Sequence, residues 1–195
     1  DRPKTAIGSI KRIEEQTDGK QMSISSYRYS GDRTVLSYEE MNGYCNRAIK
    51  LNPNCKLTLI LMQVNDMEDY MKNEGSGFVQ DLLQSVQDTV RRHVGHRGIV
   101  CPLQPNLMSV VVQDINSDIK LRAFIESLRS RIAWNYRLID PKYEISFSFG
   151  VACYPENGMD MRIVHRKLVK ALQMAQEKHA NCYVIYKEHL HGELS

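Results

Sequence analysis

Long apolar runs, a cysteine pair and clustered histidines are all missing from this sequence of 195 residues. The longest apolar run, Leu57 to Val64, is far shorter than the roughly 20 residues that a membrane-spanning helix needs, and it contains Thr58 and Gln63. No signal peptide is visible either. We therefore expect a chain without a membrane span that is located in the cytoplasm. Because it begins at Asp1 rather than Met, we expect a piece of a larger protein.

The five cysteines form no CxxC motif, and their number is odd. Three of them, Cys101, Cys153 and Cys182, lie in apolar, strand-like runs, which is typical of free buried thiols in a reducing compartment. A structural zinc site needs clustered Cys or His ligands, yet the six histidines form no group larger than the pairs His93/His96 and His189/His191. The sequence therefore predicts free thiols and no metal site.

Basic residues form no stripe, and the formal net charge is only +3. Arg91, Arg92 and Arg97, together with His93 and His96, form a local basic cluster, which we interpret as a solvated helix end and loop, so nucleic acid is not an expected partner. The sequence has no GxGxxG turn after a strand, which disfavours a Rossmann fold. No Ser–His–Asp or Cys–His arrangement is visible, so an unrelated enzyme on this scaffold is a remote alternative.

The composition, with 42% hydrophobic and 25% charged residues, is that of a globular domain with a real core. Residues 1–36 have two β-like stretches separated by an Asp18-Gly19 turn signal. We interpret them as a β-hairpin extension or a linker to an upstream sensor domain. The main domain is expected over residues 37–188, and residues 189–195 form a tail.

Hydrophobic periodicity predicts an alternation of helices and strands from Ser37 onward, with Ser37 and Glu40 as a capping box. The expected elements are a helix ending at 52, a strand over 56–64, a short helix over 66–72, a break at 75–77, a helix over 78–95, a β-hairpin over 98–103 and 107–113, a helix over 118–134, a strand over 144–153, a helix over 161–175 and a strand over 182–186. This order predicts an α/β (α+β) sandwich with one mixed or antiparallel sheet.

The last third of the chain resembles a known family. The run from Ile145 to Gly158, ISFSFGVACYPENG, is similar to the SIGVA-x-YP-x-x-G strand and turn of GGDEF domains, the bacterial diguanylate cyclases. The run from Lys170 to Lys178 resembles the family's A-D-x-A-L-Y-x-A-K helix, and Asn181 to Tyr186 resembles its closing G-R-N strand. The expected element order agrees over residues 37–188.

The resemblance implies a five-stranded sheet flanked by helices, related to the palm of nucleotide cyclases. In an active member, two such domains face each other, and each holds one GTP and two divalent metal ions. The metals activate a 3′-hydroxyl for attack on the partner's α-phosphate. The product is cyclic di-GMP.

The same resemblance implies that the catalytic positions are replaced. The family's metal-binding segment, D-I-D-x-F-K-x-I-N-D, corresponds to residues 63–72. Its first carboxylate becomes Gln63, and a neutral amide is a poor ligand for Mg²⁺. Asn65 takes the place of the segment's second aspartate. Its phosphate-facing lysine becomes Glu68, which would repel a triphosphate, and its guanine-recognising asparagine becomes Met71.

The signature G-G-D-E-F corresponds to residues 104–108. Gln104 and Pro105 replace the two glycines whose backbone approaches the phosphates. Asn106 and Leu107 replace the two carboxylates. Residues 101–113 contain no Asp or Glu, so a shift of register by one residue restores neither.

We therefore expect a catalytically inactive, regulatory GGDEF-like module of a bacterial signalling protein, with no catalytic residue, no metal and no cofactor. Its expected partners are other domains of its own protein and a second copy. An alternative is a receptor that binds GTP or cyclic di-GMP without turnover. Its vestigial pocket would comprise Gln63, Asn65, Glu68, Met71, Gln104, Pro105, Asn106 and Leu107. Asp66, Glu68 and Asp69 are interpreted as an acidic first turn of a helix, favoured by the helix dipole over a relocated metal site.

Overall fold

The computed structural model describes residues 38–113, 115, 117–139, 145–178 and 181–192. The predicted β-hairpin in residues 1–36, the capping residue Ser37 and the end of the tail lie outside the described residues. No helix in the described ranges has the length and apolarity that crossing a lipid bilayer requires.

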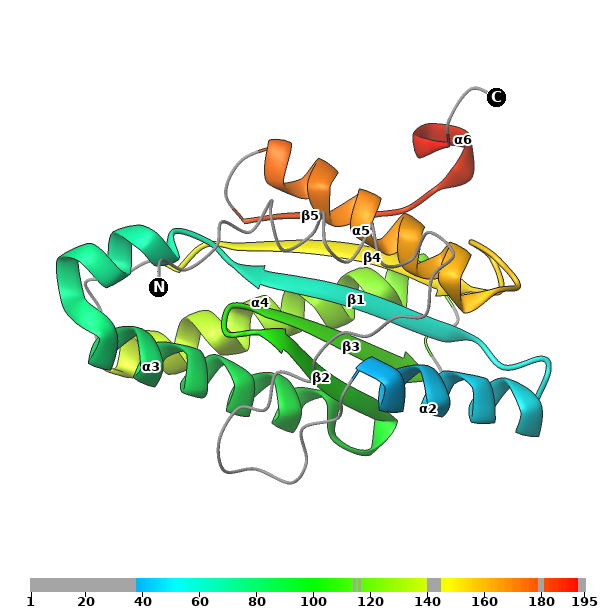
Figure 1. Cartoon of the computed structure of the whole chain (residues 1–195), viewed down its shortest axis with the longest axis horizontal. Coiled ribbons are helices and arrows are strands. Elements are labelled where there is room, and N and C mark those ends of the chain that lie inside the picture. The colour runs from blue at the N-terminus through cyan, green and yellow to red at the C-terminus, as the bar shows by residue number, and fades with distance from the viewer. Residues whose placement is uncertain (1–37, 114, 116, 140–144, 179–180, 193–195) are drawn as a thin grey trace.

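A five-stranded sheet forms the centre of the molecule, with the strand order β2-β3-β1-β4-β5 (Figure 1). The strands are β1 (Leu57–Val64), β2 (Gly98–Gln104), β3 (Leu107–Gln113), β4 (Phe147–Tyr154) and β5 (Cys182–Ile185). Strand β5 runs parallel to β4, and the other neighbouring pairs are antiparallel. The predicted mixed sheet and the predicted hairpin are confirmed.

Two layers of helices cover the sheet (Figure 1). The helices are α2 (Tyr38–Leu51), α3 (Met67–Val94), α4 (Asp118–Ile139), α5 (Met161–Glu177) and the short α6 (Glu188–His191). One apolar cluster joins α3 and α4 to one face of the sheet, and a second joins α2 and α5 to the other. The chain is therefore a three-layer sandwich.

Strand β1 lies between these layers, and all of its residues are buried. Ile60, Met62 and Val64 face α3 and α4, whereas Leu59 and Leu61 face α2 and α5. Because successive side chains of a strand point to opposite faces, a strand in the middle layer needs apolar residues on both faces, and only Thr58 and Gln63 interrupt the apolar run of β1. This explains why the longest apolar run of the sequence is this strand.

Helix α5 approaches β4 closely at Gly150. A Cβ atom at this position would lie 2.4 Å from the backbone nitrogen of Leu172 and 2.7 Å from the carbonyl oxygen of Leu168. Only glycine therefore permits this contact between helix and sheet. The contact explains the glycine of the ISFSFG run in structural terms.

Four details differ from the predicted elements. The break expected at residues 75–77 is a kink at Gly75, with φ 86° and ψ 175°, within one helical element rather than a gap between two helices. Strand β4 begins at Phe147, and α4 continues past Trp134 to Ile139. Helix α6 was not predicted, because four residues are too few to show a helical period.

The basic cluster after α3 is partly internal. His93 is buried, and its Nε2 lies 3.3 Å from the carbonyl oxygen of Phe124. The Arg97 guanidinium donates to the carbonyl oxygen of His93 at 2.6 Å and lies 4.9 Å from the centre of the Phe124 ring. The interpretation of this stretch as a solvated helix end and loop is therefore wrong for His93, whereas Arg97 is exposed although it binds His93 and lies over Phe124.

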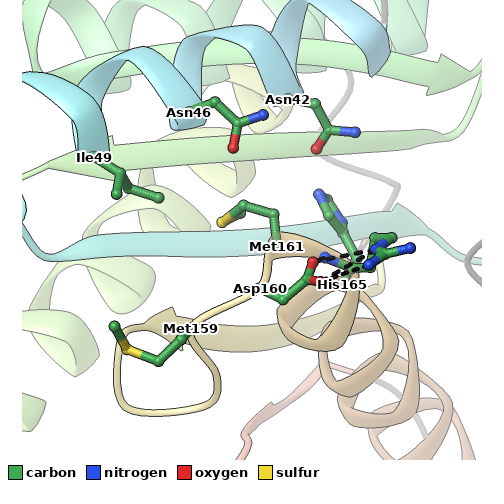
Figure 2. A pocket seen from close by; sticks show the side chains of 8 residues that line it. Asn42, Asn46, Ile49, Met159, Asp160, Met161 and His165 are labelled. Atoms are coloured by element: carbon green, nitrogen blue, oxygen red, sulfur yellow. Dashed lines mark hydrogen bonds and ion pairs between the residues drawn. The ribbon is translucent and has the colours of Figure 1, made fainter.

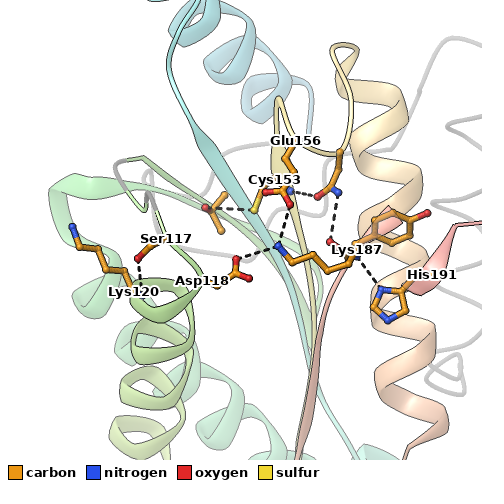
Figure 3. A network of polar contacts seen from close by, with 10 residues as sticks. Ser117, Asp118, Lys120, Cys153, Glu156, Lys187 and His191 are labelled. Carbon is orange, nitrogen blue, oxygen red and sulfur yellow. Dashed lines mark hydrogen bonds and ion pairs between the residues drawn. The ribbon is translucent and has the colours of Figure 1, made fainter. Parts of the chain in front are cut away.

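Lys187 joins three elements where the chain leaves β5 (Figure 3). Its Nζ donates to Asp118 Oδ1 of α4 at 3.1 Å and to Glu156 Oε1 of the turn after β4 at 3.0 Å. Its backbone N–H donates to Nδ1 of His191 at 2.9 Å, which fixes α6. Lys187, two residues after β5, therefore ties this part of the chain to α4, to the turn after β4 and to α6.

Replacing Lys187 with Met should lower the free energy of unfolding by about 1 kcal/mol, because both carboxylates are half exposed and solvent screens the pairs. The loss should shrink at high salt. Urea unfolding of both proteins at low and high salt measures this. Arg162→Met, which breaks a pair confined to one helix end, is the control. A loss that is independent of salt would contradict an electrostatic tie.

Candidate functional site

The end of β1 meets the turn between β2 and β3. Gln63 lies opposite Leu107 in the antiparallel register of β1 and β3. The Val64 N–H donates to the Asn106 carbonyl oxygen at 2.9 Å, and the Asn106 side-chain amide donates to the Val64 carbonyl oxygen at 3.1 Å. The structure thus brings together Gln63, Asn106 and Leu107, three residues of the predicted pocket.

Gln63 is buried, with 3% of its surface exposed, and its side chain accepts a hydrogen bond from Nε2 of Gln176. Gln176 belongs to α5, which packs on this face of the sheet. A buried amide needs a partner, and a second amide supplies one without charge. The position that the resemblance assigns to a metal-binding carboxylate therefore holds a neutral pair.

Asn65 is bound to the start of β4. Its Nδ2 donates to Ser146 Oγ at 2.9 Å and to Ser148 Oγ at 3.1 Å, and its backbone N–H donates to the Ser146 carbonyl oxygen at 2.9 Å. Ser148 Oγ lies 3.2 Å from Asn65 Oδ1, within reach to donate back. Both ends of this carboxamide are thus occupied by the protein itself.

The turn between β2 and β3 consists of Pro105 and Asn106, with Gln104 and Leu107 paired across it. Gln104 and Pro105 are half-buried, whereas Leu107 is 2% exposed and belongs to the core on the α5 side. A proline at the turn removes a backbone N–H that could otherwise bind an anion. Leu107 extends the apolar core to the position of the family's second carboxylate.

Glu68 and Met71 lie apart from this group. Both are exposed on the first two turns of α3, and neither forms a hydrogen bond to the strand-end residues in the described part of the chain. Asp66, at φ 61°, begins the helix, and Glu68 and Asp69 form its acidic first turn, where the helix dipole favours negative charge. The structure therefore gathers the strand and turn residues of the predicted pocket and leaves its two helix residues at the surface.

Sequence reasoning missed three participants, Ser146, Ser148 and Gln176. The two serines alternate with Phe147 and Phe149, so the period of two already placed them on the α5 side. No local feature of the sequence identifies Gln176, because its partner Gln63 lies 113 residues away along the chain.

The described residues contain no group of three or more His, Cys, Asp or Glu side chains placed to hold a metal ion. The strand ends offer amides, hydroxyls and one apolar side chain. These groups can form hydrogen bonds but cannot by themselves neutralise a divalent cation. None of the five cysteines forms a disulfide bond, but of the three that were predicted to be buried only Cys101 is, whereas Cys153 and Cys182 are half-buried.

The fold is shared with several solved structures. The active GGEEF domain of a diguanylate cyclase from Vibrio cholerae superimposes with a TM-score of 0.66 and 15% identity, covering 77% of this chain and 94% of that chain. The GGDEF domain of DgcB from Caulobacter crescentus, solved in complex with c-di-GMP, gives a TM-score of 0.66 and 13% identity, covering 81% of this chain and 98% of that chain. The FimX GGDEF domain from Pseudomonas aeruginosa gives a TM-score of 0.63 and 13% identity, covering 82% of this chain and 100% of that chain.

Comparison with curated proteins gives no match. The sequence itself matches the family described as "Diguanylate cyclase, GGDEF domain" over residues 38–182, which is most of the chain. The match spans every strand of the sheet at least in part, and the three-layer architecture agrees with it. The chain belongs to the GGDEF domain family.

Proposed function

We propose that this domain is catalytically silent and acts as a regulatory module in cytoplasmic bacterial signalling. It would pass a signal by docking onto neighbouring domains of its own protein or by pairing with a second copy. The observation that carries the proposal is the pairing of the buried amide of Gln63 with the half-buried amide of Gln176 at the position of the metal carboxylate. The five free cysteines support a reducing location.

The turn between β2 and β3 also supports the proposal that the domain is catalytically silent. Asn106 uses its side-chain amide to bind the Val64 carbonyl oxygen, and Leu107 is buried in the core. Magnesium requires several oxygen ligands in near-octahedral geometry, with carboxylates or phosphates to supply charge. The charges that directly follow β1 are those of the first turn of α3, where Glu68 is exposed. Negative charge at this point repels a nucleotide triphosphate.

Incubation with GTP and Mg²⁺ or Mn²⁺ should yield no cyclic di-GMP, because the described residues offer no group of three or more His, Cys, Asp or Glu side chains placed to hold a metal ion. Chromatography of the nucleotides measures this. The active GGEEF domain from Vibrio cholerae, assayed in parallel, is the positive control. Product formed within about a hundred-fold of that control's rate, and abolished by Gln63→Leu, would overturn the proposal.

The alternative of a nucleotide receptor is weakened by Asn65, whose carboxamide is already bound to Ser146 and Ser148. Titration calorimetry with GTP, GDP and cyclic di-GMP distinguishes the two. Heat of binding at high micromolar nucleotide, lost in Asn106→Ala, would favour the receptor. The absence of heat would favour docking.

A further inference from the structure

A groove of about 480 Å³ lies between α2 and the start of α5, away from the strand ends (Figure 2). Clefts of about 300–1,000 Å³ are the usual size for sites that enclose a small molecule. Asn42, Asn46 and Ile49 line the groove from α2. These three residues are four and three positions apart, so they form one face of the helix. The groove therefore has the size of a ligand site, and one of its walls is a single helix face that carries two amides.

The opposite wall is apolar and carries two thioethers. Met159 and Met161 line it, and Ile49 lies across the groove from them (Figure 2). Met159 is 75% exposed at the rim, whereas Met161 is 7% exposed. A thioether is polarizable and makes favourable contacts with aromatic rings, and the flexible methionine side chain adapts to the shape of its neighbour. This wall therefore fits the face of a flat aromatic ring.

The described residues that line the groove offer a ligand no counterion. The two charged ones, Asp160 and Arg162, are paired with each other at 2.8 Å. His165 is 2% exposed, and burial lowers the pKa of its imidazole to about 3, so the ring is neutral near pH 7. A charged ligand would lose its hydration here without gaining an opposite charge. The groove therefore selects an uncharged ligand.

The α2 wall supplies the hydrogen-bonding groups. Oδ1 of Asn42 is buried and receives no hydrogen bond in the described part of the chain. A buried acceptor of this kind calls for a donor. Asn46 lies one turn further along α2 and is exposed, and its carboxamide contains both donors and an acceptor. A ligand that fits both amides therefore carries an N–H donor and, close to it, an acceptor atom.

We propose that this groove binds a small, uncharged heteroaromatic molecule whose ring N–H donates to Oδ1 of Asn42. The ring lies between Ile49 and the methionine wall, and a ring nitrogen accepts from the amide of Asn46. Helix α5 begins at the groove, and Gln176 in its last turn pairs with Gln63, so the ligand contacts the helix that reaches the strand ends. The inference does not depend on catalytic silence, because the groove is separate from the strand ends.

Benzimidazole is a suitable probe, because it is flat, carries one ring N–H and one acceptor nitrogen, and is uncharged at pH 8. The full 195-residue chain, labelled with carbon-13 at its methionine methyl groups, is titrated with it and followed by NMR. The methyl signals of Met159 and Met161 should shift progressively at millimolar probe. Those of Met62 and Met108 should not, because both are fully buried against the other helical layer.

The matched control ligand is 1-methylbenzimidazole, which has the same ring without the N–H. It should bind about three- to ten-fold more weakly, which is the effect of one hydrogen bond. Asn42→Ala should abolish this difference by weakening the binding of benzimidazole alone. Asn73→Ala, at an exposed position on α3, is the matched control variant and should leave both affinities unchanged.

Three results would overturn the proposal. The first is the absence of a shift for Met159 and Met161 at millimolar benzimidazole. The second is equal affinity for the two ligands in the parent protein, which would mean that Asn42 accepts no hydrogen bond from the ring. The third is an Asn42→Ala protein that still prefers benzimidazole to its methylated form. If Asn42→Ala does not fold, the comparison of the two ligands on the parent protein decides.

Discussion

Replacing Gln63 with Asp, Asn106 with Asp and Leu107 with Glu should make the stability of this domain depend on divalent metal. In chelator the triple variant should unfold at a free energy about 3 kcal/mol or more below the parent, because two of the new carboxylates replace side chains that are 2–3% exposed. The Asn106→Asp change also removes the amide donor that now binds the Val64 carbonyl oxygen. Mg²⁺ or Mn²⁺ should recover about 2.7 kcal/mol at a hundred-fold excess over the dissociation constant.

Thermal melting in chelator and in metal measures the effect. The control is the double variant Gln63→Asn with Leu107→Gln, which changes two of the same buried positions without adding charge. Its melting temperature should be the same in chelator and in metal. The register places Gln63 directly opposite Leu107, so two of the new carboxylates would lie at paired positions of neighbouring strands. If the triple variant melts identically with and without metal, the assignment of these positions to the family's metal site is wrong. Activity is not expected to return, because Glu68 and Pro105 remain.

The fold could be predicted because its signals are local. Each strand of the sheet is an apolar run bounded by turn residues, and α5 carries apolar residues at helical spacing. The family resemblance placed Gln63 in one pocket with Asn106 and Leu107, and β1 does pair with β3 next to the hydrogen bonds between Val64 and Asn106. Element ends were less predictable, since β4 begins only at Phe147.

For the site, the sequence could predict only the chemical character of the residues at the strand ends, not their partners. That Gln63 cannot replace a carboxylate is chemistry, but its partner Gln176 is distant in sequence and lies on a helix predicted only to fill the core. The groove between α2 and α5 depends on the packing of two helices more than 100 residues apart. Tertiary neighbours of this kind leave no periodic trace in the sequence.

His165 should make the domain sensitive to mild acid. It is 2% exposed, and burial lowers the pKa of its imidazole from 6.5 to about 3. The native state therefore keeps His165 neutral, whereas the unfolded chain takes up a proton as the pH falls below about 6.5. Uptake by the unfolded state alone lowers the free energy of unfolding by up to about 1.4 kcal/mol per pH unit, continuing toward pH 3.

The contribution of His165 can be separated from that of His93, whose pKa burial also lowers. Urea unfolding at pH 7, 6, 5 and 4.5 should give a shallower dependence on pH for His165→Gln than for the parent. The difference in slope should approach one proton, about 2 to 3 kcal/mol between pH 6.5 and 4.5. His96→Gln, at an exposed residue, controls for the loss of a histidine as such. Parallel curves for parent and His165→Gln would mean that the imidazole is protonated inside the fold. In that case the α5 end of the groove would have to open to water as the pH falls.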